Sequence, residues 1–156
     1  MKKKYLLIAF LTAAVDLVVK AFVRRIPEGT VFFSMLPLFD FVHTQNTGAA
    51  FSMFHGNPAL VTVLSMAMLG LMLVVLLQDG TFSRKALMAL SVTIGGGMGN
   101  FVERLFFGSV TDYIQILFFR FPIFNLADIF VTLSVVYLMI LLLTGKLENK
   151  TEDIHG

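Results

Sequence analysis

Four long apolar runs divide this chain, and they constrain its fold more than any other feature. The runs cover residues 5–23, 60–77, 86–103 and 125–144. A helix needs roughly 20 apolar residues to cross a bilayer, and in lipid it must satisfy its own backbone hydrogen bonds. The hydrophobic fraction of 57% exceeds that of an ordinary soluble domain. The sequence therefore predicts an all-α membrane protein with four transmembrane helices, built as a single domain over residues 1–156.

The loop 24–58, between the first two runs, is predicted to form a small β-rich region on the extracytoplasmic membrane surface. It mixes Phe and Val with turn residues, and Val31–Phe33 and Leu38–His43 have the composition of short strands. The segment 104–124, before the last run, is aromatic and is expected to be a loop.

The distribution of basic residues predicts the orientation of the chain. With four spans, both termini and the loop 78–85 share one side of the membrane. That side carries seven basic residues: Lys2, Lys3, Lys4, Arg84, Lys85, Lys146 and Lys150. The other side carries four: Arg24, Arg25, Arg104 and Arg120. Because basic residues are enriched on the cytoplasmic side, both termini are expected there. The formal net charge of +2 does not indicate a nucleic-acid partner.

The N-terminal stretch KKKYLLIAFLTAA has the basic start, apolar core and small residues of a signal peptide. A lipoprotein signal would need a following cysteine, and the chain has none. Asp16 and Lys20, just beyond this stretch, favour a retained helix with a function, because ionisable groups inside a span are costly. The two share a helix face. We expect an ion pair with Lys20 extending to the outer interface, and the pair would anchor the helix against polar groups elsewhere.

The motif GGGMGNFVER closes the third run. Gly95 and Gly99 form a small-xxx-small pair, which indicates close helix packing and not a phosphate loop. Asn100 and Arg104 lie on one helix face, where Arg104 is either an interfacial anchor or a ligand for a carboxylate or a substrate carbonyl. Glu103 is placed to pair with Arg104 or with Arg24.

Two aspartates are predicted to meet at the extracytoplasmic end of the spans. Asp112 lies in GSVTDYIQI, whose apolar flanks suit a carboxylate held against the bilayer surface. In FPIFNLADIF, Asn125 is a predicted N-cap and Asp128 the N3 residue of the same capping arrangement. Asp112 and Asp128 emerge at one face, so the cap and a carboxylate pair can coexist.

Such a pair supports aspartic-peptidase chemistry. Two close carboxyl groups in a low-dielectric site share one proton, so one activates water while the other donates. This chemistry needs no metal or other cofactor. Serine and zinc peptidase chemistry fit poorly, because the three histidines lie outside the runs and no H-E-x-x-H motif occurs.

At this point the chain resembles the bacterial lipoprotein signal peptidases (signal peptidase II), which are aspartic membrane peptidases with four spans. Five blocks carry the resemblance in order: DLVVK at 16–20, NTGAAFS at 46–52, GGGMGNFVER, VTDYI and FPIFNLAD. The family usually has aspartate where this chain has Glu103, whose extra methylene still permits a pair with arginine.

The resemblance implies a role for each matching residue. Asp112 and Asp128 would be the catalytic pair, surrounded by Asn100, Asn125 and Ala127. Arg104 and Asn46 would contact the substrate, and Gly48 would allow a tight loop backbone. Asp16 and Lys20 would support the floor of the site.

The implied reaction is removal of the signal peptide from a diacylglyceryl-modified prolipoprotein, by cleavage before the lipidated cysteine. The expected partners are lipidated prolipoproteins and membrane lipid, the expected state is a monomer, and the expected location is the bacterial inner membrane. Two alternatives remain at this stage. One is an ion or proton carrier using Asp16, Asp112 and Asp128, although carriers often show internal repeats, and none is seen here. The other is a structural membrane subunit, which would leave the polar residues unexplained.

Overall fold

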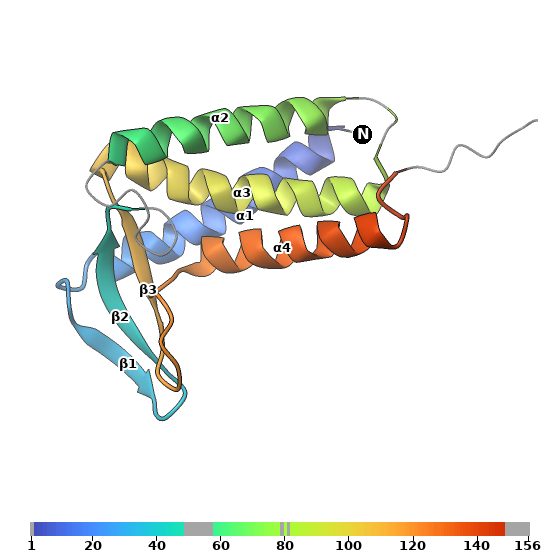
Figure 1. Ribbon diagram of the computed structural model, residues 1–156. Helices are drawn as coiled ribbons and strands as arrows, with labels where there is room; N and C mark the ends of the chain where they lie inside the picture. Colours follow the sequence, from blue (N-terminus) through green and yellow to red (C-terminus); the bar gives the residue numbers. More distant parts are fainter. Residues whose placement is uncertain (1, 49–57, 79, 81, 149–156) are drawn as a thin grey trace, which may run out of the picture.

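The computed structural model describes residues 2–48, 58–78, 80 and 82–148, and in these residues four helices carry a small sheet at one end (Figure 1). The helices are α1 (Lys2–Val23), α2 (Pro58–Leu77), α3 (Arg84–Phe107) and α4 (Leu126–Leu143). The strands are β1 (Val31–Met35), β2 (Phe39–Asn46) and β3 (Val110–Ile116). Of the predicted segments, residues 49–57 of the loop, including part of the NTGAAFS block, lie outside the described residues, as does Lys150.

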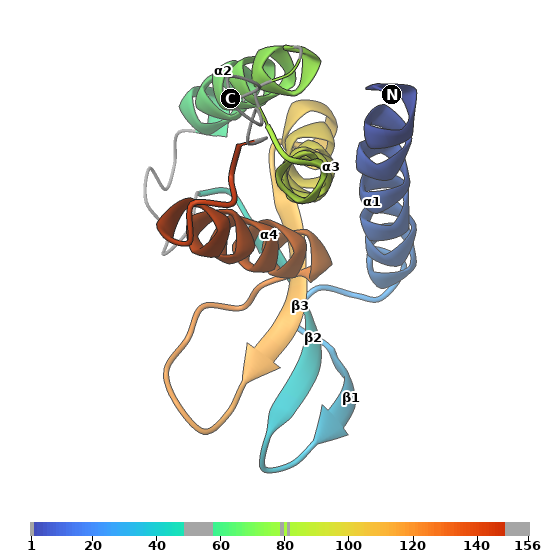
Figure 2. The ribbon, with the colours of Figure 1, turned by 90° about the vertical axis from the view of Figure 1, so that its right-hand side faces the viewer.

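Helix α3 is the centre of the bundle and packs against each of the other three helices (Figure 2). Its glycines permit this. A side-chain carbon added at Gly96 would lie 2.8 Å from the carbonyl oxygen of Ala127 on α4, and one added at Gly95 or Gly99 would overlap α1. The packing role predicted for Gly95 and Gly99 is therefore confirmed.

Three of the described helices are long and apolar enough to cross a membrane: Lys2–Val23, Ala59–Leu77 and Leu126–Leu143. Helix α3 exists as predicted but does not reach this hydropathy, because its glycines, Asn100 and Glu103 make it more polar than the others. Large apolar side chains cover the outside of the bundle, as expected for a surface that faces lipid, among them Phe10, Leu71 and Leu142.

Both ends of α3 are capped, and the cap at its C-terminal end directs the chain into β3. Ser83 caps the start of the helix by accepting from the Ala86 N–H at 3.2 Å. Gly108 ends it in the left-handed region, with φ of 72°, where glycine carries no steric cost. The chain turns there and enters β3 two residues later.

The sheet is antiparallel, in the order β1-β2-β3. The predicted strands at Val31–Phe33 and Leu38–His43 are confirmed as β1 and most of β2, whereas β3 occupies a segment predicted to be a loop. The register of β2 against β3 shifts between Phe41 and Thr44, so that Thr44 faces Asp112. Bulges of this kind re-aim side chains near functional sites.

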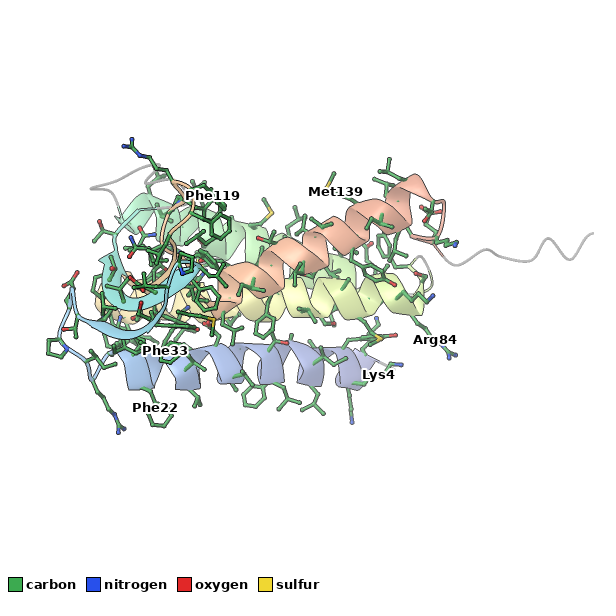
Figure 3. The ribbon with its side chains drawn as sticks, turned by 90° about the horizontal axis from the view of Figure 1, so that it is seen from below. Lys4, Phe22, Phe33, Arg84, Phe119 and Met139 are labelled. Atoms are coloured by element: carbon green, nitrogen blue, oxygen red, sulfur yellow. The ribbon has the colours of Figure 1, made fainter. Side chains whose placement is uncertain are left out.

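The start of α1 and the start of α3 lie at the end of the bundle opposite the sheet (Figure 1). Phe22, Phe33 and Phe119 gather at the sheet end, whereas Lys4 and Arg84 lie at the far end (Figure 3). At that far end Ser83 N–H donates to Leu147 O at 2.9 Å, which ties the α2–α3 turn to the segment after α4.

Candidate active site

A cavity of about 1040 Å³ opens between α2, α3, α4 and the sheet. Its wall within the bundle is apolar, with Leu64 and Met68 of α2 and Leu133 of α4. Its sheet end is polar, with six side chains from the sheet, α3 and the start of α4: Asn46, Asn100, Arg104, Asp112, Asn125 and Asp128. An apolar cavity with a few convergent polar groups is the usual form of a ligand site.

Asp112 lies on β3 and is buried, with 3% of its surface exposed. Its Oδ2 accepts from Asn46 Nδ2 at 2.9 Å, and its Oδ1 accepts from Asn125 Nδ2 at 2.6 Å. Neighbours from β2 and from the start of α4 therefore fix this carboxyl group from two sides.

Asp128 lies in the first turn of α4, within a complete capping box. Asp128 N–H donates to Asn125 Oδ1 at 3.1 Å, and Asn125 N–H donates to Asp128 Oδ2 at 3.1 Å. The predicted cap is confirmed. The other oxygen of Asp128 accepts from Asn100 Nδ2 at 2.8 Å, so the cap residue also faces the cavity.

Asn125 joins the two aspartates. Its side chain binds the Asp112 carboxyl group and caps α4, whose N3 residue is Asp128. The meeting of Asp112 and Asp128 at one cavity, predicted from the sequence, therefore depends on one fully buried amide.

Burial and then the charge of Asp128 raise the pKa of Asp112 from 3.8 to about 7, against the opposing effect of hydrogen bonds from Asn46 and Asn125. The protonated form of this carboxyl group is therefore favoured more than in an exposed aspartate. A proton donor and a carboxylate in one cavity are the two groups that aspartic hydrolysis requires.

A second layer of charged groups lies beneath the aspartates. Lys20 Nζ is 2.6 Å from Asp16 Oδ2 and donates to Asn100 Oδ1 at 2.6 Å. Asp16 Oδ1 accepts from the N–H of Ala127, two residues into α4, at 3.0 Å. The predicted ion pair is confirmed. The prediction that Lys20 extends to the interface is wrong: its exposure is 0%, because Asn100 and Asp16 supply partners inside the bundle.

Arg104 and Glu103 have different partners, so that of the two arginines predicted as partners of Glu103 the structure shows Arg24. Glu103 pairs with Arg24, whose Nε lies 2.8 Å from Oε1. Arg104 instead donates from Nη2 to the carbonyl of Gly48 at 3.0 Å. Gly48 N–H donates to Asn46 Oδ1 at 2.9 Å, which forms a tight turn at the end of β2. Arg104 thus closes the cavity against the β2 turn.

All ten predicted site residues belong to one connected network of hydrogen bonds and an ion pair. In order of contact they are Ala127, Asp16, Lys20, Asn100, Asp128, Asn125, Asp112, Asn46, Gly48 and Arg104. Sequence reasoning missed Tyr113 and Thr111. Tyr113 Oη accepts from the N–H of Leu126 at 3.2 Å, and Thr111 binds Glu103. The β-branched and aromatic residues of VTDYIQI were the available signal for this strand.

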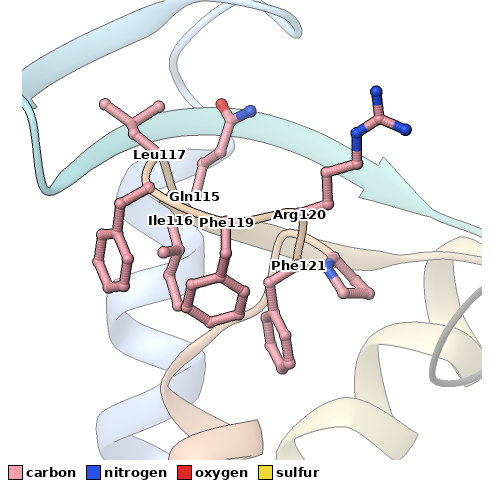
Figure 4. Close-up of a pocket in the computed structure, with 8 residues that line it drawn as sticks. Gln115, Ile116, Leu117, Phe119, Arg120 and Phe121 are labelled. Carbon is pink, nitrogen blue, oxygen red and sulfur yellow. The ribbon is translucent and has the colours of Figure 1, made fainter.

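The loop after β3 forms an aromatic edge of the cavity. Phe119, Phe121 and Pro122 line the cavity, and the loop also surrounds a smaller hollow beside Arg120 (Figure 4). Phe118, Phe119, Phe121 and Phe124 contact one another edge to face, which stiffens the loop.

The protein is an apolar helical bundle in which two aspartates face one cavity at the sheet end. This arrangement fits the class of membrane-embedded hydrolases that use a pair of carboxyl groups. Comparison with known proteins identifies the family. The family model described as "Signal peptidase (SPase) II" matches residues 8–144. The chain therefore belongs to the signal peptidase II family, and it is a protease.

Individual relatives agree with this family. The chain is 36% identical over 155 residues to a lipoprotein signal peptidase of Bartonella tribocorum, covering 93% of this chain and 89% of the relative. It is 31% identical over 137 residues to a lipoprotein signal peptidase of Streptococcus agalactiae serotype V, and the match covers 87% of this chain and 89% of the relative. A bacterial membrane enzyme solved by the in meso method at 2.3 Å superposes with a TM-score of 0.84 and 27% identity, covering 96% of this chain and 93% of that one.

Proposed function

We propose that this chain removes signal peptides from diacylglyceryl-modified prolipoproteins, cleaving before the lipidated cysteine, with Asp112 and Asp128 as the catalytic residues. Membership of the signal peptidase II family supports the reaction. The observation that carries the assignment of residues is the amide of Asn125, which binds Asp112 while capping the helix turn that holds Asp128.

The two aspartates have different surroundings, which suggests different roles. Asp128 accepts hydrogen bonds from the backbone N–H of Asn125 and from Asn100 in the first turn of α4, and it faces the cavity. Asp112 is buried in β3 and has a raised pKa, which favours the acid. Asp128 then takes a proton from water, and Asp112 donates one to the scissile carbonyl oxygen.

The chemical step follows from these roles. The water oxygen adds to the carbonyl carbon, which gives a tetrahedral intermediate with both oxygens protonated. The C–N bond then breaks as Asp128 passes its proton to the leaving amine nitrogen, while one hydroxyl group of the intermediate gives its proton back to Asp112. Both carboxyl groups thus return to their starting protonation. Arg104, beside the cavity, is suited to orient the substrate backbone.

The cavity suits a substrate that enters from lipid. Its bundle wall is apolar between α2 and α4, which fits a signal helix, and its aromatic edge is placed to meet the lipid-bearing residue. In our proposal α3 also crosses the membrane, in addition to the three apolar helices, and its neighbours shield it from lipid. The site faces the extracytoplasmic side of the inner membrane, both termini are cytoplasmic, and the enzyme acts as a monomer.

The experiment is cleavage of a purified, diacylglyceryl-modified precursor beside the same precursor without lipid. Asp112→Asn and Asp128→Asn should each abolish cleavage, because each removes the proton exchange of one partner while keeping the side-chain shape. Asp40→Asn is the matched control, since Asp40 lies on β2 but does not line the cavity. Full cleavage by either cavity variant would refute the catalytic assignment, and equal cleavage of the unlipidated precursor would refute the substrate.

A further inference from the structure

Arg24, directly after α1, reaches the corner where α3 ends and β3 begins. Its Nε donates to Glu103 Oε1 at 2.8 Å and to Thr111 Oγ1 at 2.9 Å. Its guanidinium lies 3.6 Å from the centre of the Phe107 ring, in the geometry of a cation–π contact. One side chain therefore joins three elements.

Glu103 is the centre of this junction, which also holds the backbone beside Asp112. Glu103 Oε2 accepts from the N–H of Thr111 at 2.7 Å, and its Oε1 accepts from Thr111 Oγ1 at 3.0 Å. Thr111 is fully buried and immediately precedes Asp112 on β3. The position of the Asp112 backbone thus depends on a carboxylate anchored to α3.

This buried carboxylate needs a cation, and two are within reach. Lys20 Nζ is 3.8 Å from Glu103 Oε2, but it lies 2.6 Å from both Asp16 and Asn100. Removing one partner of a buried pair leaves an uncompensated charge, which is much costlier than replacing both partners. Without Arg24, the attraction of Lys20 to Glu103 would compete with the hydrogen bond from Lys20 to Asn100. Asn100 in turn donates a hydrogen bond to Asp128.

We propose that Arg24 is a positioning residue of the peptidase: by neutralising Glu103 it fixes β3 beside Asp112 and leaves Lys20 to hold Asn100 beside Asp128. The proposal rests on the proposed function, since it assumes that these two aspartates are catalytic. Arg24 acts through Glu103, Thr111 and Lys20 and does not line the cavity.

The test compares Arg24→Gln with Arg25→Gln, using the lipidated precursor and separate measurement of kcat and KM. Arg25 has the same charge and is the next residue, but it is exposed and its guanidinium contacts Phe22. Arg24→Gln should lower kcat about tenfold and change KM less than about twofold, because the cavity wall is intact while the aspartates are displaced. Arg25→Gln should match the wild type.

A double variant separates the charge from the packing of Arg24. Arg24→Gln combined with Glu103→Gln buries no unpaired carboxylate, and the amide oxygen at position 103 can still accept from Thr111 N–H. Its kcat should return to within about threefold of the wild type. If Arg24→Gln alone fails to fold, as judged by gel filtration in detergent, the kcat of the double variant still tests the positioning role of Arg24.

The outcomes distinguish the two proposals. Wild-type kcat in a folded Arg24→Gln variant, or a folded double variant still about tenfold slow, would overturn the positioning role. Both results leave the proposed function standing as long as Asp112→Asn and Asp128→Asn are inactive. Activity in either aspartate variant would instead overturn the catalytic assignment.

Discussion

At the scale of single residues, Asn125 combines a structural and a chemical task. It caps α4 and donates from Nδ2 to Asp112. Asn125→Ser should separate the tasks, because serine caps about as well as asparagine but is too short to bind Asp112. A hydrogen bond to a charged group contributes about 1.5–3 kcal/mol, so we expect a decrease in kcat of about 10- to 100-fold. The melting temperature should fall less than in a variant that loses the cap as well, because serine keeps the cap.

Asn125→Ala is the comparison, since alanine removes the cap as well and should lower both the melting temperature and kcat. If the serine variant lost stability to the same degree as the alanine variant, the cap and the Asp112 contact would not be separable, contrary to this prediction.

The raised pKa of Asp112 predicts how activity and stability depend on pH. Its pKa is about 7 in the folded protein, against 3.8 for an ordinary aspartate. Between these values the native state binds more protons than the unfolded state, so the free energy of unfolding should fall as pH rises from about 4 to 7. The rate should fall above about pH 7, as Asp112 loses the proton it donates. Melting temperatures over this range should decline less in Asp112→Asn, and an equal decline would assign the effect to other groups.

At the scale of elements, the contacts of α3 depend on its glycines. Gly99→Ala should destabilise the fold by about 1–3 kcal/mol, because the added methyl group meets the Asp16 carboxylate. Gly70→Ala on α2 is the matched control: no atom lies within 4 Å of its added carbon, so stability should be unchanged or slightly higher. Unfolding in detergent measures the stability of both variants. Equal stability of Gly99→Ala and Gly70→Ala would contradict close packing at Gly99.

The elements also show what a sequence can and cannot predict. Apolar length predicted all four helices, and N-cap chemistry predicted the start of α4 at Asn125. Strand β3 was missed because its pairing partner, β2, lies far away along the chain. The choice of Arg24 as the partner of Glu103, and the bond from Lys20 to Asn100, could not be predicted either, since they depend on how α1 and α3 meet in space. Residue types and the family resemblance thus selected ten residues that the structure brings into one network, whereas the tertiary fold determined which atoms they bind.

At the scale of the whole molecule, the orientation can be tested cleanly because the chain contains no cysteine. Lys3→Cys lies at the end far from the sheet, and Thr30→Cys lies beside β1; both positions are exposed. In intact spheroplasts a membrane-impermeant maleimide should label position 30 only, because the sheet end faces outward in our proposal. After permeabilisation it should label both. Labelling of both positions in intact spheroplasts would contradict the prediction that the single span α1 separates them and places position 3 on the cytoplasmic side.

The backbone link between β3 and Phe124 has an evolutionary consequence. Tyr113 and Ile114 donate to Phe124 O at 2.9 and 2.8 Å, and Phe124 N–H donates to Ile114 O at 3.1 Å. Beyond the end of β3, residues 117–123 form a loop that these bonds close, while Asp112 and Asp128 stay on the bundle side of the link. Changes in the length or composition of this loop can therefore accumulate without disturbing the acids. A lineage can reshape the cavity edge for new substrates while its chemistry is inherited unchanged.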